Sequence, residues 1–256
     1  MKPLLNVEEI SKYYGKIKAC DRISFNLYPA QVLGIVGESG SGKSTLLNAI
    51  GGYIPIESGN ITYTMPNGEI LTLPKLSETH HRLLRRTEWG FVQQNPRDGL
   101  RMNVTAGANI GERLMDIGIK NYGKIREESS YWLNQVEIDT NRIDDLPKMF
   151  SGGMQQRLQL ARVLVTKPRL ILMDEPTGGL DVSVQARLLD LISSLVRNLR
   201  LSVILVTHDL GVVRLLAHRL LVMKNGQIVE SGLTDQVLDD PQHFYTQQLV
   251  SATLMP

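Results

Sequence analysis

A glycine-rich turn between an apolar segment and a helix-forming segment is the feature that most restricts how this chain can fold. Residues 32–36 are apolar and predict a short buried strand, and residues 43–50 predict a helix. Between them lies Gly37-Glu38-Ser39-Gly40-Ser41-Gly42-Lys43-Ser44, whose glycines permit a tight backbone turn. A buried strand that turns directly into a helix is typical of an α/β fold.

The same alternation of strand and helix returns in the second half of the chain. The sequence predicts buried strands at 170–173 and 203–206, with a helix at 182–197 between them. Two hairpins are predicted at 61–73 and 220–229, the second turned at Asn225-Gly226. We therefore expect a mostly parallel sheet with covered faces and some antiparallel β elements.

The middle of the chain differs from both ends because it lacks strand signals. It predicts helices broken at Gly107, Gly111, Gly118 and Gly123. We interpret 95–156 as a helical subdomain inserted into an α/β core of about 1–94 and 157–235. A C-terminal extension of about 236–256 completes a single domain of 256 residues.

Composition excludes several classes of protein. Apolar runs do not exceed four residues, whereas a membrane span needs roughly 20, so no membrane insertion is expected. The lone Cys20 and the lack of a secretory signal at the N-terminus predict a cytoplasmic protein. A net charge of +2 with dispersed basic residues does not indicate nucleic-acid binding.

The glycine-rich turn also matches the phosphate-binding pattern G-x-x-x-x-G-K-[ST] at every position. Backbone N–H groups in such a P-loop converge on phosphate oxygens. Lys43 would then face the β- and γ-phosphates, and the Ser44 hydroxyl would bind Mg²⁺. A turn without a ligand is the weaker interpretation, because the flanking strand and helix are also present.

Two more strand ends carry candidate catalytic side chains. Asp174 and Glu175 follow the strand at 170–173, where Asp174 could hold the water shell of Mg²⁺ and Glu175 could activate the attacking water. The alternative is that the two acids only cap the strand or the next helix. His208 follows the strand at 203–206, and there a structural role and a contact with the γ-phosphate are equally open.

A second anion-binding helix end is predicted at residues 150–157. Ser151, Gly152 and Gly153 precede a helical segment, and the N-terminus of a helix offers N–H groups and a positive dipole. The sequence therefore predicts two phosphate-binding sites, the glycine-rich turn and this helix end. The residues alone do not indicate which molecule carries the phosphate at the second site.

These motifs, in this order, resemble those of an ATP-binding-cassette ATPase over essentially the whole chain. The resemblance identifies 150–157 as the signature, Gln94 as the Q-loop glutamine, 178–181 as the D-loop and His208 as the switch histidine. It implies that Gln94 senses Mg²⁺ and the γ-phosphate and that Tyr14 stacks on adenine, with Tyr13 as the alternative. The nucleotide-contacting residues it implies are Tyr14, Gly37, Ser39, Gly40, Gly42, Lys43, Ser44, Thr45, Gln94, Ser151, Gly152, Gly153 and Asp181.

The resemblance also implies an activity and an assembly. ATP and Mg²⁺ would be bound, with Ser44, Gln94 and Asp174 at the metal and Glu175, His208 and Lys43 as catalytic residues. Two chains would pack head to tail as a homodimer, so that the signature of one chain contacts the ATP bound by the other. The homodimer would contain two composite ATP sites.

A closer resemblance is to the cassette subunits of bacterial carbon–phosphorus lyase systems. It is carried by the segments 86–90, 95–101, 109–115 and 141–147, and Met154 departs from the commonest signature as in oligopeptide importers. This implies a partner in the soluble lyase core complex and a part in organic phosphonate catabolism. The alternative is the ATP-binding subunit of a peptide or phosphonate importer. The C-terminal segment 239–247 is shared by both groups and does not separate them.

Overall fold

The computed structural model describes residues 2–254, and it divides into two compact units. The first unit contains the chain up to His81 and from Val196 onward, and the second contains Arg82–Leu195. Among the described residues, no helix is both long and apolar enough to cross a membrane. The boundaries of the inserted subdomain at 95–156 remain a prediction.

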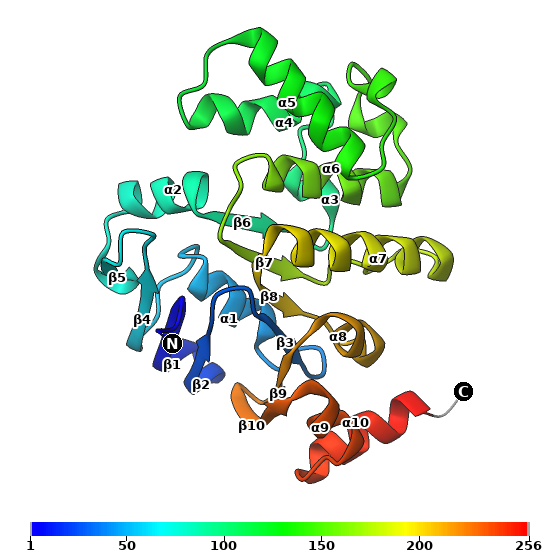
Figure 1. Cartoon of the computed structure of the whole chain (residues 1–256). Helices are drawn as coiled ribbons and strands as arrows, with labels where there is room; N and C mark the ends of the chain where they lie inside the picture. The colour runs from blue at the N-terminus through cyan, green and yellow to red at the C-terminus, as the bar shows by residue number, and fades with distance from the viewer. Residues whose placement is uncertain (1, 255–256) are drawn as a thin grey trace. The chain divides into compact units, whose positions relative to one another are not determined.

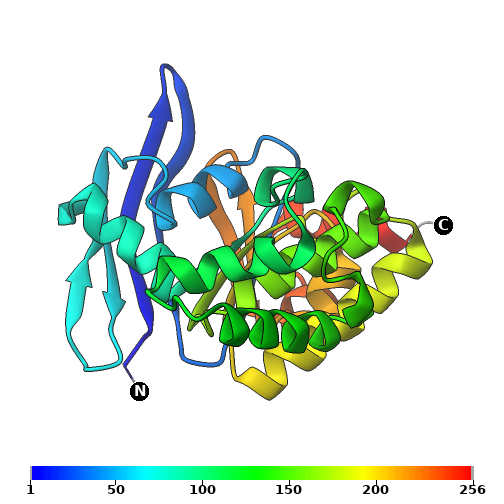
Figure 2. The ribbon, with the colours of Figure 1, turned by 90° about the horizontal axis from the view of Figure 1, so that it is seen from above.

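The first unit contains an antiparallel sheet of four strands in the order β2-β1-β4-β5. Figure 2 shows the long β1–β2 hairpin in dark blue and the β4–β5 hairpin in cyan. The strands are β1 (Leu5–Tyr14), β2 (Ile17–Leu27), β4 (Ser58–Thr64) and β5 (Ile70–Thr72), and the short helix η1 (Leu73–Lys75) follows them.

The first unit also contains the strand that precedes the glycine-rich turn. β3 (Val32–Val36) is completely buried and lies between β8 (Ser202–Val206) and β9 (Arg219–Lys224), parallel to both. β10 (Gln227–Leu233) pairs with β9 in the antiparallel sense. The helices of this unit are α1 (Lys43–Ile50), α8 (Leu210–Leu216), α9 (Thr234–Asp239) and α10 (Phe244–Leu254) (Figure 1).

The second unit consists of a parallel strand pair and a group of helices. β6 (Trp89–Val92) pairs with β7 (Leu170–Asp174), and the carboxyl ends of both strands leave the same edge. The helices are α3 (Pro96–Gly99), α4 (Ala106–Asp116), α5 (Tyr122–Gln135), η2 (Thr140–Arg142), η3 (Pro147–Met149) and α6 (Gly152–Leu164). Residues of α2 (Glu78–Thr87) and α7 (Val182–Leu199) belong to both units.

The sequence correctly predicted the elements around the glycine-rich turn, the two acids and His208. The strands β3, β7 and β8, the helices α1 and α7 and both predicted hairpins are confirmed. At the β9–β10 turn both Asn225 (φ 48°) and Gly226 (φ 77°) have positive φ, as a two-residue hairpin of this kind requires. The fold is α/β with parallel and antiparallel strand pairs, as expected.

The sequence analysis did not identify β1, β2 and β6. In β1 the register of pairing shifts between Val7 and Ile10, and Glu9 has a φ of 47°. Such a bulge interrupts the alternation of apolar and polar residues from which a strand is predicted. β6, a strand of four residues, was also missed.

The prediction that Gly107 and Gly111 break helices is wrong, because both lie inside α4. A β-carbon at Gly107 would press on the side chain of Ile143, and one at Gly111 would press on Ile125 of α5. The two glycines therefore permit close packing around α4. Gly118, with a φ of 93°, does lie in the turn after α4, and Gly123 lies in the first turn of α5.

Asn109 of α4 connects the helix to the loop that precedes it. Its side chain is completely buried. The Oδ1 atom accepts from the Arg101 N–H at 2.8 Å, and Nδ2 donates to the carbonyls of Arg101 (3.1 Å), Val104 (2.8 Å) and Thr105 (3.0 Å). One amide side chain thus binds four backbone groups. Without it the Arg101 N–H and the Val104 carbonyl would lose this partner, whereas the Arg101 and Thr105 carbonyls still accept from the N–H groups of Val104 and Asn109.

We expect Asn109→Ala to lower the free energy of unfolding of the helical part by about 1–3 kcal/mol, since the Arg101 N–H and the Val104 carbonyl lose a hydrogen-bond partner. Urea unfolding followed by circular dichroism measures the change. The exposed Asn141 provides the control, because Asn141→Ala should change stability by less than about 0.5 kcal/mol. Equal stability of the two variants would contradict this view of Asn109.

Candidate nucleotide site

The turn between β3 and α1 has the backbone conformation that its glycines predict. Gly37, Gly40 and Gly42 have φ values of 154°, 82° and 103°. A β-carbon at Gly37 would collide with the carbonyl oxygen of Met223, and one at Gly42 would collide with that of Ala19. Gly37 and Gly42 are therefore needed for close approach, and Gly40 for its positive φ alone.

Lys43 is only 7% exposed although it carries a charge. Its Nζ donates to the carbonyl of Gly37 at 2.7 Å and to that of Glu38 at 2.8 Å, and it is 3.5 Å from the Ser41 hydroxyl. These oxygens compensate the burial of an ammonium group. The charge is thereby held against the turn whose N–H groups are the expected phosphate ligands, with Ser39, Gly40 and Ser44 exposed beside it.

The β9–β10 hairpin supports the turn from the other side. The Gly226 N–H donates to the Ser41 carbonyl at 3.0 Å, and the Asp21 N–H donates to the Gly226 carbonyl at 2.8 Å. The phosphate-binding turn is thus connected to β2 and to the hairpin by backbone hydrogen bonds. A sequence motif alone does not reveal these supports, because they come from distant segments.

His208 leaves the same edge of the sheet as the glycine-rich turn. β8 is the parallel neighbour of β3, and the Thr207 N–H donates to the Ile35 carbonyl at 3.1 Å. His208 is exposed, and Asp209 after it caps α8 by accepting from the Gly211 N–H at 2.8 Å. The structure therefore brings the predicted switch histidine to the side of the sheet where the P-loop lies.

Both candidate adenine-stacking tyrosines are at the end of β1. Tyr14 is 50% exposed and Tyr13 is 36% exposed. The Tyr13 N–H donates to Glu57, and the Lys12 ammonium lies 5.4 Å from the centre of the Tyr14 ring. Tyr14 offers the larger open ring surface, so it remains our prediction for the stacking residue.

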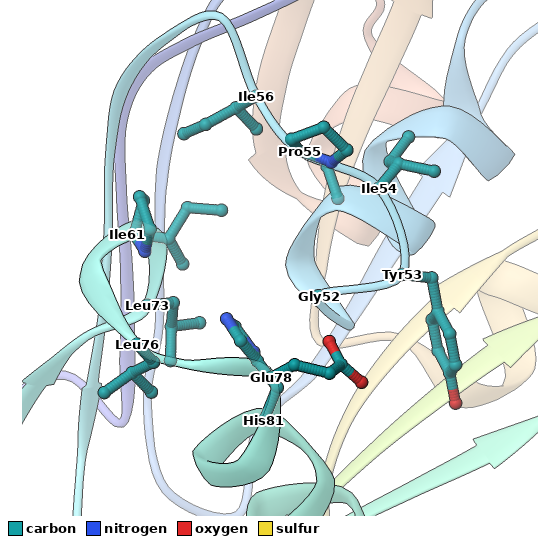
Figure 3. Close-up of a pocket in the computed structure, with 12 residues that line it drawn as sticks. Gly52, Tyr53, Ile54, Pro55, Ile56, Ile61, Leu73, Leu76, Glu78 and His81 are labelled. Carbon is teal, nitrogen blue, oxygen red and sulfur yellow. The ribbon is translucent and has the colours of Figure 1, made fainter.

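A pocket of about 310 Å³ opens at the C-terminal end of α1 (Figure 3). Aliphatic side chains from several segments line it, and Tyr53, Glu78 and His81 are its ionisable members. None of the residues in the glycine-rich turn lines it. This pocket is therefore separate from the phosphate-binding turn within the first unit.

In the second unit the structure brings together the two acids and the Q-loop glutamine. Asp174 ends β7, and Gln94 comes two residues after β6, the parallel neighbour of β7. A β-carbon at Gly178 would be 3.5 Å from the Gln94 amide nitrogen and 3.3 Å from the Glu175 carbonyl oxygen. Glu175 has a φ of 44°, a conformation that costs a residue with a β-carbon about 1 kcal/mol or more and that recurs at functional sites.

The signature residues form the N-terminus of the 13-residue helix α6. Ser151 is the N-cap, and its hydroxyl accepts from the Met154 N–H at 3.4 Å. Ser151 and Gly152 are exposed, whereas Gly153 is buried where a β-carbon would press on Val184 of α7. The exposed helix end has the geometry expected of an anion site.

The D-loop connects this helix end to the acids. A β-carbon at Gly152 would be 3.6 Å from the Leu180 side chain. Asp181 is exposed, and its carbonyl accepts from the Gln185 N–H at 2.8 Å as α7 begins. Residues 174–181 therefore run from the end of β7 to the start of α7, and Leu180 lies beside the N-terminus of the signature helix α6.

Met154, the position that departs from the commonest signature, has a structural partner. The Arg142 guanidinium donates to its sulfur at 3.5 Å and to Asp145 at 2.7 Å, and it lies 4.4 Å from the centre of the Phe150 ring. Met154 therefore belongs to the packing below the helix end, while the serine and the backbone face outward.

Two buried glutamines of α6 hold the Q-loop, and the sequence analysis did not identify them. Gln159 is 1% exposed, and its amide pairs with the backbone of Gln93 in both directions. Its Oε1 accepts from the Gln93 N–H at 2.7 Å and its Nε2 donates to the Gln93 carbonyl at 3.2 Å. Gln156 donates to the same carbonyl at 3.3 Å. The only signal in the sequence is polar residues on a helix that is otherwise buried.

Comparison with known proteins agrees with this geometry. Residues 20–178 match the family model described as ABC transporter, so this chain belongs to the ATP-binding-cassette family. It is 61% identical to the phosphonates utilization ATP-binding protein PhnK of Escherichia coli, over 98% of both chains. It is 37% identical to the dipeptide transport ATP-binding protein DppD of the same species, over 97% of this chain and 78% of that protein.

Solved structures support the fold. The ATP-binding cassette MJ0796, solved as a dimer bound to ADP and Pi, is 28% identical and superimposes with a TM-score of 0.79, covering 90% of this chain and 98% of its own. CbiO1 from Clostridium perfringens is 26% identical, with a TM-score of 0.81, and the match covers 99% of this chain and 96% of that one. The chain is therefore an ABC ATP-binding protein.

We expect Gln159→Met to loosen the Q-loop specifically, because a thioether of similar length cannot pair with the Gln93 backbone. Amide hydrogen exchange at residues 91–95 should rise, and stability should fall by about 1–3 kcal/mol. Gln155 provides a matched control, since its buried amide donates instead to the Pro147 and Phe150 carbonyls, both at 3.0 Å. Equal exchange at Gln93 in Gln159→Met and Gln155→Met would contradict the proposed clamp.

Proposed function

We propose that this chain hydrolyses ATP as a homodimer and that the resulting conformational cycle supports a carbon–phosphorus lyase complex in phosphonate breakdown. The observation that carries the first part is the position of Lys43. Its ammonium group is held at the mouth of a turn with the backbone of a phosphate-binding loop. The family to which the chain belongs supports ATP as the phosphate compound.

In this proposal each predicted site residue keeps the function that the sequence assigned to it. The Gly37–Thr45 backbone would bind the phosphates, and Lys43 would neutralise charge on the β- and γ-phosphates. Glu175 would accept the proton of the attacking water, and His208 would contact the γ-phosphate. Tyr14 would stack on the adenine ring.

Oxygen ligands are present for the Mg²⁺ that accompanies ATP. Ser44, Gln94 and Asp174 would hold the ion, and hydroxyl, amide and carboxylate oxygens suit this metal. Two of them, Gln94 and Asp174, leave the same edge of the β6–β7 pair. The ion would neutralise phosphate charge during hydrolysis.

Dimerisation accounts for the second anion site. The exposed end of α6 would contact the γ-phosphate bound by the partner chain, through Ser151, Gly152 and Gly153. Asp181 would lie at the same composite site. The solved dimers of MJ0796, one of them bound to ADP and Pi, support dimerisation.

The partner complex is proposed from similarity. The 61% identical relative carries a name that refers to phosphonates utilization, and the match extends over nearly the whole of both chains. We propose that the chain works in the cytoplasm on the soluble lyase core. An importer subunit is the second candidate, favoured by the 37% identity to a dipeptide transport protein.

Glu175→Gln should retain ATP binding and slow turnover by roughly 10²-fold or more, because an amide cannot accept the proton of the attacking water. Phosphate release measures turnover. If ATP is bound between two chains, the slow variant should also accumulate as a dimer with ATP during size-exclusion chromatography. Glu127→Gln, at an exposed position of α5, is the matched control and should behave as the wild type. Unchanged turnover in Glu175→Gln would remove Glu175 from this function.

Co-purification separates the two candidate partners. A tagged chain from cells that use a phosphonate as their phosphorus source should recover soluble lyase subunits, identified by mass spectrometry. The same isolation from cells grown on inorganic phosphate is the control. Recovery of a membrane permease in place of lyase subunits would favour the importer.

A further inference from the structure

The segment between α9 and α10 is fixed to the body of the first unit. The Glu230 carboxylate of β10 accepts from the Gln242 N–H at 2.8 Å and from the His243 N–H at 3.0 Å. Burial raises the pKa of Glu230, but hydrogen bonds to the carboxylate lower it overall, so Glu230 is ionised near neutral pH. Neither the sequence motifs nor the proposed function explains why this segment is so tightly held.

The anchored segment directs one aromatic side chain inward. His243 accepts from the Tyr245 N–H through Nδ1 at 3.1 Å as α10 begins. Tyr245 is 2% exposed, whereas its neighbour Phe244 is 69% exposed. The Lys224 ammonium lies 4.3 Å from the centre of the Tyr245 ring. The Lys224 ammonium group over the ring and the anchored turn before α10 are two constraints, and together they determine where the Tyr245 hydroxyl lies.

The hydroxyl of Tyr245 reaches the phosphate-binding turn. It accepts from the Glu38 N–H at 3.0 Å. Burial raises the pKa of Tyr245 above its usual value, so the hydroxyl stays neutral across the physiological range. This is a contact between the C-terminal extension and the second residue of the P-loop.

The Glu38 N–H belongs to the same peptide group as the Gly37 carbonyl, which accepts from Lys43 at 2.7 Å. A peptide group is planar, so a hydrogen bond to its N–H also determines the direction of its carbonyl. Tyr245 holds one end of this plane, and Lys43 is bound to the other. Rotation of the plane would move the Gly37 carbonyl away from the ammonium group.

We propose that Tyr245 is a positioning residue for Lys43, acting through the peptide between Gly37 and Glu38. The C-terminal extension is then part of the nucleotide site although it contacts no phosphate. This inference rests on the proposed function, because it assumes that Lys43 binds the phosphates of ATP. A proline at position 38 could not make the contact, since it has no N–H.

The test is Tyr245→Phe, which keeps the ring and removes the acceptor. We expect the affinity for MgATP to fall about fivefold to tenfold, the usual effect of one lost hydrogen bond, and amide exchange at Glu38 to rise. Tyr63→Phe is the matched control, because Tyr63 is equally buried but lies in β4. It should alter neither the affinity nor the exchange at Glu38. Unchanged affinity and exchange in Tyr245→Phe would overturn the proposal.

A second variant tests the same contact from the donor side. Glu38→Pro removes the N–H and should bind MgATP more weakly than Glu38→Ala, which keeps it. Adding Tyr245→Phe should weaken the alanine variant but not the proline variant, since the contact is already absent there. Additive losses would contradict the inference. If the wild type and Lys43→Ala bind ATP equally well, the proposed function fails, independently of Tyr245.

Discussion

The rest of the nucleotide site depends on the hydrogen bonds that the Lys43 ammonium group donates to the Gly37 and Glu38 carbonyls of its own turn. A buried ammonium group is costly unless oxygen atoms surround it, so the backbone of the turn has to be held still. Met223, Ala19 and Gly226 provide this support from β9, β2 and the hairpin turn. Segments far from the P-loop motif in the sequence are therefore needed for the phosphate binding that the motif predicts.

In the second unit, buried amide side chains hold a loop backbone in place, as the neighbouring segments do for the glycine-rich turn in the first unit. Gln159 and Gln156 hold the Gln93 backbone from α6, the helix whose N-terminus is the signature. A change at Ser151 that moves α6 would therefore also move the Q-loop. If the proposed dimer forms, the signature serves the partner's ATP and Gln94 serves the chain's own. The glutamine clamp would then connect the two composite sites within one chain.

The sequence predictions were correct where contiguous residues carry the pattern and failed where the outcome depends on irregular strands or on neighbouring helices. The strand before Gly37, the helix after it and the strand before Asp174 were predictable because contiguous residues carry the pattern. β1 was missed because a bulge at Glu9 breaks its alternation. α4 was wrongly divided, because a glycine that breaks a helix and one that permits close packing look alike until the neighbouring helix is known.

The amino-acid sequence alone was sufficient to predict the chemistry proposed for this chain: a phosphate-binding turn, two carboxylates after a buried strand and a second helix end for an anion. Each depends on residue types at short spacing, which impose local backbone conformation and supply the reactive groups. The hydrogen bonds that hold the predicted site in place can be identified only in the folded chain. The Tyr245–Glu38 and Gln159–Gln93 hydrogen bonds join segments that are far apart in sequence. Hydrogen-bond partners at such distances are selected by the packing of whole elements, and no local pattern encodes them.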